Sequence, residues 1–192
     1  MNNIELLNTD WLNLKLGEMI AKEDKYLLLI TPYINLKEET KKSLKTSKAK
    51  ICIIIQEIYD KNEERKKKKL EDFQKLKEYL SNVNFIETPD LHAKIYLSSN
   101  KIIVTSMNLQ NYSQNKNFEL GFVFDNEEDD EICKKIIEEI KLFLRKNEKD
   151  ETIPDKLYYK HCANKKCNEL IEKKYKYCKK CNDDYKNSQG GN

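Results

Sequence analysis

The stretch LHAKIYLSSNKIIVTSMNLQNYSQNKNFELGF, residues 91–122, places polar side chains at the ends of apolar segments. A strand that only fills a core needs no histidine, lysine or glutamate. An imidazole, an ammonium, an amide, a hydroxyl and a carboxylate that meet at strand ends can bind a phosphate and react with it. The stretch therefore predicts a phosphate site, whose candidate residues are His92, Lys94, Ser106, Asn108 and Glu119.

The apolar segments within this stretch predict two strands, residues 92–98 and 101–105, that form a hairpin. Since side chains alternate along a strand, we expect His92, Lys94 and Tyr96 to share one face. The later polar residues follow the second strand or open the next one, where side chains are free to face a cleft.

The rest of the chain alternates between short apolar runs and helical periodicity. Further strands are expected at residues 26–30, 51–55, 83–87 and 118–124, and helices at 10–21, 36–47, 70–80 and 132–145. This order predicts an α/β sandwich with a mixed sheet. The two runs YLLLI and ICIII, without polar alternation, indicate central strands that are buried on both faces.

Composition excludes several classes of protein. Of the 192 residues, 39% are hydrophobic, enough for a core, and the 36% that are charged include both signs. No run reaches the length of a membrane span, and the first residues do not resemble a signal peptide. We therefore expect a cytoplasmic protein that has no membrane partner and whose cysteines stay reduced.

The candidate groups suit phosphodiester chemistry. A neutral imidazole can attack phosphorus, while Lys94 and Asn108 can stabilise charge on the non-bridging oxygens. A carboxylate such as Glu119 can fix the tautomer of the imidazole. This mechanism needs no divalent metal. A lone histidine on a strand is more often an ordinary satisfied residue, but here the other groups follow it in register.

The segments HAK (92–94), TSMN (105–108) and NFELG (117–121) resemble the H-x-K…S-x-N…E signature of the phospholipase D superfamily. The resemblance runs from residue 91 to 124 and implies that family's α/β/α sandwich. It implies that His92 is the nucleophile or the general acid. It further implies that Lys94 and Asn108 bind phosphate, Ser106 supports them, and Glu119 orients the histidine.

Two positions depart from the family pattern. Its usual aspartate falls on Ser99 and its usual glycine on Thr105. The family site uses two motifs, whereas this chain has one, and its other histidine, His161, lacks the H-x-K context. The resemblance therefore implies a homodimer that shares one active site. Single-motif members are largely nucleases, which implies a nuclease that acts on DNA or RNA, with DNA favoured.

Four cysteines near the end, Cys162, Cys167, Cys178 and Cys181, are spaced C-x4-C-x10-C-x2-C. Two close pairs separated by a short segment are typical of one structural, tetrahedral zinc. So short a module cannot bury enough apolar surface to fold alone, so the metal would stabilise it. A redox pair is the alternative for the last two cysteines, and His161 could replace Cys162 as a ligand.

The terminal module is also the basic part of the chain. Residues 151–192 carry ten lysines and six acidic residues, interleaved with tyrosines, which suits nucleic acid. A protein-binding ribbon with a solvated lysine face is the alternative. We expect three parts: a phospholipase D-like catalytic domain at 1–148, a linker at 149–157 and a zinc-ribbon-like module at 158–192.

The sequence thus predicts a metal-independent, homodimeric phosphodiesterase that forms a phosphohistidine, with zinc only as a structural cofactor. Two alternatives stay open. The first is an inactive nucleic-acid-binding or scaffold protein, which the departures at Ser99 and Thr105 favour. The second is a phospholipid phosphodiesterase, against which the lack of an apolar membrane-surface helix argues.

Overall fold

The structure is a computed structural model that describes residues 4–126, 130–146, 159–161 and 170–172. The chain divides into two compact units, residues 1–152 and 153–192, which are described separately. The four cysteines of the predicted zinc module lie outside the described residues, as does the expected linker.

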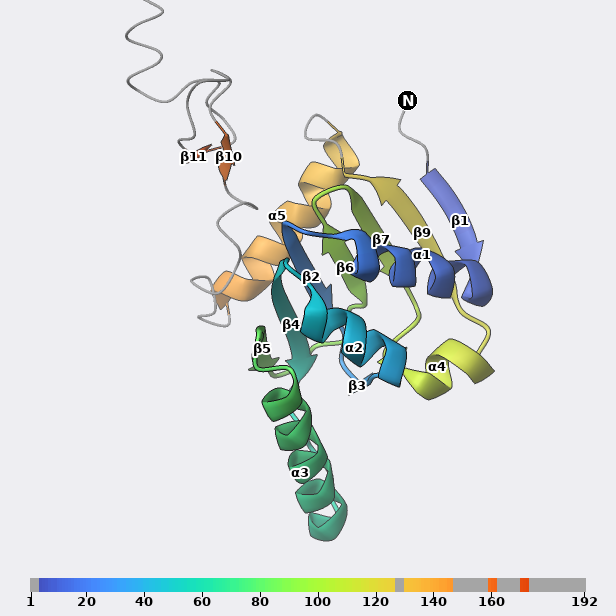
Figure 1. Ribbon diagram of the computed structural model, residues 1–192, viewed down its shortest axis with the longest axis vertical. Helices are drawn as coiled ribbons and strands as arrows, with labels where there is room; N and C mark the ends of the chain where they lie inside the picture. Colours follow the sequence, from blue (N-terminus) through green and yellow to red (C-terminus); the bar gives the residue numbers. More distant parts are fainter. Residues whose placement is uncertain (1–3, 127–129, 147–158, 162–169, 173–192) are drawn as a thin grey trace, which may run out of the picture. The chain divides into compact units, whose positions relative to one another are not determined.

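A seven-stranded sheet forms the centre of the first unit, in the order β1-β9-β7-β6-β2-β4-β5 (Figure 1). Neighbours β2, β4 and β5 are parallel, and the other pairs are antiparallel, so the predicted mixed sheet is confirmed. The strands are β1 Ile4–Asn8, β2 Tyr26–Ile30, β4 Lys50–Gln56, β5 Val83–Thr88, β6 Ile95–Ser98, β7 Lys101–Thr105 and β9 Leu120–Asp125.

Helices cover both faces of this sheet. The three helices α1 Thr9–Lys22, α2 Glu38–Thr46 and α3 Glu63–Tyr79 pack on one face, and α5 Glu131–Lys146 packs on the other (Figure 1). The side chains of Asn8 and Asn62 cap α1 and α3 by accepting hydrogen bonds from backbone N–H groups of the first turns. A short helix, α4 Asn111–Lys116, follows a two-stranded parallel pair, β3 Ile34–Asn35 and β8 Leu109–Gln110.

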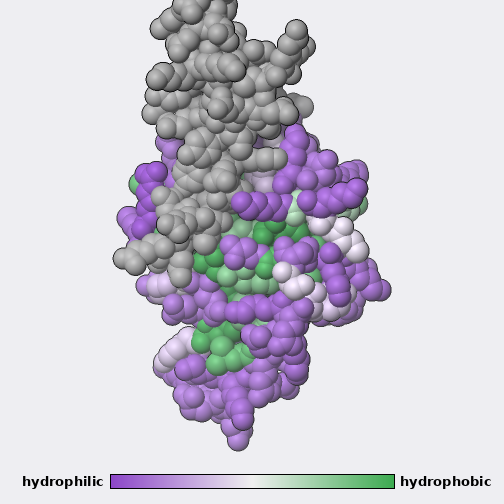
Figure 2. Space-filling model, turned by 60° about the vertical axis from the view of Figure 1, so that its left-hand side comes forward, coloured by the Kyte–Doolittle hydropathy of each residue, from purple (hydrophilic) through white to green (hydrophobic). Residues whose placement is uncertain are grey.

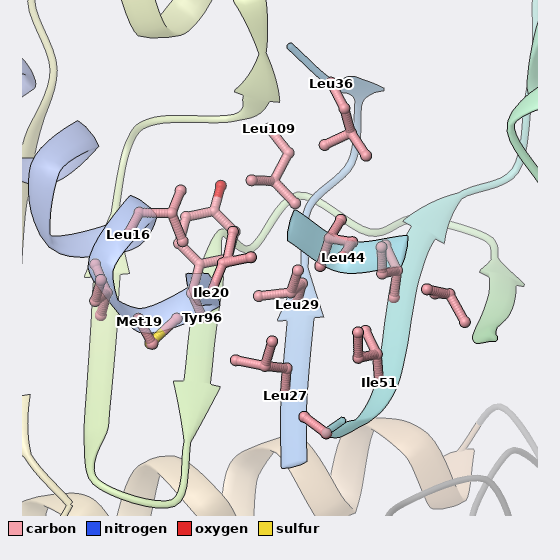
Figure 3. Packing of buried hydrophobic residues seen from close by; sticks show 14 of the residues in the cluster. Leu16, Met19, Ile20, Leu27, Leu29, Leu36, Leu44, Ile51, Tyr96 and Leu109 are labelled. Carbon is pink, nitrogen blue, oxygen red and sulfur yellow. The ribbon is translucent and has the colours of Figure 1, made fainter. Parts of the chain in front are cut away.

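The core lies between the sheet and the first group of helices. All five residues of β2 are buried, as are the five central residues of β4, in line with the expectation from their apolar runs. Leu27 and Leu29 of β2 share one cluster with Leu16 of α1 and Leu44 of α2, and Figure 3 shows Leu29 beside Leu44 and Leu16 beside Tyr96 of β6. Burial of each such side chain contributes roughly 1.5–3 kcal/mol, which fixes the sheet as a rigid platform.

The structure corrects one predicted strand. Residues 92–94 are not part of β6, which begins at Ile95. The neighbouring strand β2 ends at Ile30, the partner of Ile95, because Pro32 cannot donate to a ladder. Residues 92–94 therefore have no β2 partner, and the predicted strand starts three residues later than expected, at Ile95.

Four small elements of the first unit were not predicted. These are the edge strand β1, the pair β3–β8 and the helix α4. In the second unit, β10 Tyr159–His161 pairs with β11 Leu170–Glu172 in an antiparallel hairpin. Among the described residues, none of the helices combines the length and hydropathy that crossing a membrane would require.

Candidate active site

All five candidate residues lie at one end of the central strands, on a rim formed by the starts of β6 and β9 and the end of β7. Because β6 and β9 run antiparallel to β7, the starts of β6 and β9 meet the end of β7. His92 and Lys94 precede β6, and Ser106 and Asn108 follow β7. Glu119 stands immediately before β9. Residues far apart in sequence therefore reach the same rim, as the pattern of polar groups at strand ends predicted.

His92 is exposed in the loop that leads into β6, and Lys94 is half-buried behind it. The ammonium of Lys94 donates to the carbonyl oxygen of His92 at 2.7 Å and lies 3.4 and 3.5 Å from the two ring nitrogens. Burial lowers the pKa of Lys94, and the negative charge of Glu119 partly offsets this effect. The imidazole of His92 and the ammonium of Lys94 therefore lie close together at the rim, where one ligand can contact both.

The loop before His92 contains a tight turn. Asp90 has a φ of 55°, the left-handed region that aspartate tolerates better than most residues. The carbonyl of Thr88, just before this turn, accepts a hydrogen bond from the backbone N–H of Glu57. The turn redirects the chain from the end of β5 and brings His92 to the rim.

Glu119 is buried, with 6% of its surface exposed, and its carboxylate accepts three side-chain hydrogen bonds. Ser106 Oγ donates to Oε2 at 2.5 Å, while Ser113 Oγ and Asn117 Nδ2 donate to Oε1 at 2.5 and 3.1 Å. Burial acts to raise the pKa of Glu119, but these bonds and the nearby Lys94 outweigh it, so the pKa lies below its ordinary value. The carboxylate is therefore held in its charged form.

The hydrogen-bond partners of Glu119 within the single chain are other than His92. Among residues 4–126, no hydrogen bond joins Glu119 to His92; instead, the carboxylate organises Ser106 and its neighbours. Sequence reasoning did not identify Ser113, which is 2% exposed. Its hydroxyl also accepts the backbone N–H of Asn108 at 3.1 Å and so links two candidate residues.

Thr31 is the other residue that was missed. This side chain, fully buried at the end of β2, accepts the backbone N–H of Leu109 at 3.2 Å and donates to the carbonyl of Tyr33. Its hydroxyl lies 3.5 Å from Asn108 Oδ1. The sequence offers no signal for it beyond its place between an apolar run and a proline, because the burial and the hydrogen bonds that mark it come from the fold.

Both departures from the family pattern are accommodated. The hydroxyl of Thr105 donates to the carbonyl of Leu120 and accepts the N–H of Met107, which completes the turn after β7. Ser99 binds the buried carboxylate of Glu23 through its N–H and its hydroxyl, at 2.8–3.0 Å. Ser99 is thus fixed by a buried carboxylate at the turn between β6 and β7, at the ends of these strands away from the candidate site.

The comparisons with known proteins agree with this fold. A family model described as "Cardiolipin synthase, PLD-like domain" matches residues 16–143, more than half of the chain. No curated protein matches the sequence. Nuc from Salmonella typhimurium, a phospholipase D family member, has a similar structure, with a TM-score of 0.57 and 13% identity over 78% of this chain and 96% of that one.

Two other solved structures are similar. NucT from Helicobacter pylori has a TM-score of 0.59 and 12% identity, over 78% of this chain and 98% of that chain. Polyphosphate kinase from Porphyromonas gingivalis has a TM-score of 0.53 and 11% identity, over 73% of this chain and 26% of that chain. These identities show a shared fold and no more. The family match together with the H-x-K…S-x-N…E residues at one sheet edge shows that the chain belongs to the phospholipase D-like family.

Proposed function

We propose that this protein is a metal-independent phosphodiesterase that acts as a homodimeric nuclease on DNA or RNA. The observation that carries the proposal is the meeting of His92, Lys94, Asn108 and the Ser106–Glu119 pair at one rim, within a phospholipase D-like domain. The single H-x-K motif, which the resemblance associates with nucleases, supports a nucleic-acid substrate, and DNA is the favoured one.

The reaction would take two steps. A ring nitrogen of His92 attacks phosphorus, an N–P bond forms, and the bond to the leaving oxygen breaks. That oxygen takes a proton from the second His92 of the dimer. Water then attacks the phosphohistidine, gives its proton to the second histidine, and the N–P bond breaks. Lys94 and Asn108 stabilise the charge on the non-bridging oxygens in both steps.

An apolar surface beside the site supports a second copy of the chain. Leu6 of β1 pairs with Phe122 of β9, and the two are 60% and 47% exposed. Leu120, 44% exposed, follows Glu119 directly. A monomer seldom leaves adjoining large apolar side chains in water, so this edge of the sheet fits a subunit contact. Such a contact would bring two candidate sites together.

The zinc module remains part of the proposal. We expect Cys162, Cys167, Cys178 and Cys181 to hold one structural Zn²⁺, which would stabilise the module without a role in the reaction. In sequence, the first cysteine pair falls between β10 and β11, a hairpin of the kind that places two ligands close together. The lysines of this module would bind nucleic acid.

A phospholipid is the second candidate substrate, because the matching family model is described by cardiolipin synthase. Hydrolysis of phosphatidylglycerol or cardiolipin vesicles would favour that reading, while cleavage of oligonucleotides alone would favour the nuclease.

The proposal is tested by nuclease assay in excess EDTA. We expect the wild type to remain active, His92→Ala to lose activity by at least about a hundredfold, and Ala93→Ser, an exposed neighbour in the same loop, to stay active. Loss of all wild-type activity in EDTA, with the zinc module shown to retain its metal, would contradict the mechanism.

A further inference from the structure

A second concave site lies beside the candidate active site. It is a groove of about 810 Å³ between the ends of β2 and β4, the pair β3–β8, and the facing sides of α2 and α3. Figure 2 shows a largely hydrophilic surface with two hydrophobic areas, the lower of which lies at the height of α3 in Figure 1. Nothing in the proposed reaction uses this groove.

The lining of the groove comes within two residues of the candidate active site, although none of the five candidate residues is part of it. Gln110 lines it and stands two residues after Asn108, so their Cα atoms are at most about 7.6 Å apart. Tyr33 lines it as well, and the carbonyl of Tyr33 accepts the hydroxyl of Thr31, which in turn lies 3.5 Å from Asn108 Oδ1. A substrate bound through its phosphate at Asn108 could therefore extend into the groove.

The lining combines an apolar floor with exposed rings. Tyr59 and Tyr33, 72% and 51% exposed, line the groove, whereas a third lining ring, Tyr79, has the ammonium of Lys45 over its face at 4.0 Å. The floor is formed by side chains such as Phe73 and Leu76. Planar aromatic rings beside apolar surface form stacking platforms for bases, which bind without regard to sequence.

The lysines of the groove are all held in ion pairs. Its lining includes three lysines and three acidic residues. Each lysine is in an ion pair, at 2.7 Å for Lys41 with Glu38, 2.7 Å for Lys69 with Asp60 and 3.8 Å for Lys75 with Asp72. Lys69 is paired with Asp60 from outside the lining, so the three lysines stand against four acidic residues, Glu57 included, a net charge of −1. Such a groove offers little to phosphates but suits neutral planar groups, with amides at Asn35, Gln56 and Gln110 as hydrogen-bond partners.

We propose that this groove binds unpaired bases of a single-stranded nucleic acid next to the phosphate that is cleaved. The proposal rests on the proposed nuclease function and adds a substrate class to it. A base can reach the rings only when it is unstacked and unpaired, so the enzyme prefers single strands to duplexes of the same sequence.

The experiment uses the full-length protein and compares Tyr59→Ala and Tyr33→Ala with Tyr112→Ala. Tyr112 is 69% exposed and does not line the groove. Two substrates are used, a single-stranded oligonucleotide and the small diester bis(p-nitrophenyl) phosphate. We expect the two groove variants to raise KM for the oligonucleotide about tenfold, to leave hydrolysis of the small diester unchanged, and the Tyr112 variant to behave as wild type.

Binding to the His92→Ala protein gives a second measurement. The groove substitutions, made in this background, should weaken binding of a fluorescent single strand by a similar factor. Because stacking is not electrostatic, the ratio of affinities with and without the Tyr59→Ala substitution should persist at high salt. Any decrease in affinity as the salt concentration rises should therefore come from charged groups outside the groove.

The outcomes separate the two proposals. Unchanged affinity and KM in both groove variants, an equal effect of Tyr112→Ala, or an equal loss with the small diester would overturn the base-binding groove. A wild type that cleaves a duplex as readily as a single strand would overturn it too. A wild type that hydrolyses neither substrate would instead overturn the proposed nuclease function.

Discussion

The hydroxyl of Ser113 joins Glu119 to Asn108: it donates to Glu119 Oε1 at 2.5 Å and accepts the backbone N–H of Asn108 at 3.1 Å. One buried side chain from α4 thus connects the carboxylate before β9 with the amide residue after β7. The position of Asn108 depends on this connection as much as on the strand that precedes it.

Replacement of Ser113 by alanine should lower the free energy of unfolding by about 1–3 kcal/mol at pH 7, because a buried N–H and a buried carboxylate each lose a partner. Ser81→Ala, an exposed serine, should change it by less than about 0.5 kcal/mol. Chemical denaturation measures both. A Ser113→Ala protein as stable as wild type would show that the hydrogen bonds of Ser113 do not stabilise the fold.

The same substitution should alter the acid dependence of stability. The pKa of Glu119 is below its ordinary value of 4.5 in the folded protein, so its contribution to stability is complete above pH 4.5. The contribution is lost as the pH falls through the folded-state pKa. Because Ser113→Ala raises that pKa toward 4.5, the stability difference between the variant and wild type should shrink below pH 4.5. An unchanged difference would contradict this assignment.

Gly121 and Gly17 should respond in opposite ways to alanine. A Cβ at Gly121 would lie 2.7 Å from Thr105 Cβ and 2.8 Å from Leu12 Cδ2, whereas nothing lies within 4 Å of one at Gly17. We expect Gly121→Ala to destabilise by about 1–3 kcal/mol and Gly17→Ala, in an exposed helical position, to stabilise by about 0.5–1 kcal/mol. Thermal unfolding compares them. Because Thr105→Gly also removes two hydrogen bonds, it should be measured alone and together with Gly121→Ala. The double variant should lose less stability than the sum of the two single variants, and strict additivity would exclude Thr105 as the cause.

The subunit contact is tested by Phe122→Glu. A charge at this exposed apolar position, beside Leu6, should dissociate the dimer, and activity should fall in parallel because each site loses its second His92. Leu14→Glu, at a 49% exposed position on α1, is the matched control and should leave both properties intact. Sedimentation and nuclease assays on the same samples provide the measurement. A fully active monomer would contradict the shared site.

Thiol labelling tests the zinc module. Burial raises the pKa of Cys52 to about 12, so this thiol should not react with iodoacetamide in the folded protein at pH 8. The four terminal cysteines should also resist labelling until a chelator strong enough to remove zinc is added, after which four thiols react. One zinc per chain by elemental analysis should accompany this pattern. Four reactive thiols before chelation would contradict a zinc site.

The sequence predicted the elements whose signal lies within one segment of the chain, such as a continuous apolar run or a helical period. The apolar run of β2 and the helical periodicity of α5 are local signals, and both elements are confirmed. The start of β6 could not be predicted, because it depends on where its neighbour β2 ends. A strand boundary set by a partner is a tertiary property that alternation within one segment does not contain.

The residues of the candidate site also fall into two sets, those that the sequence predicted and those that it did not. His92, Lys94 and Glu119 stood out because charged groups beside apolar strands are unusual. Ser113 and Thr31 did not, since serine and threonine are common in loops and only their burial and bonding mark them. The hydrogen bonding of Ser99 to Glu23 was equally hidden, because the two residues are 76 positions apart in the chain.

The stereochemical course at phosphorus tests the central claim most directly. A phosphorothioate diester of known configuration at phosphorus would be cleaved in ¹⁸O-labelled water and the product configuration determined. Two successive displacements, first by His92 and then by water, predict net retention. Net inversion would mean that water attacks phosphorus directly, and a phosphohistidine intermediate on this protein would then be ruled out.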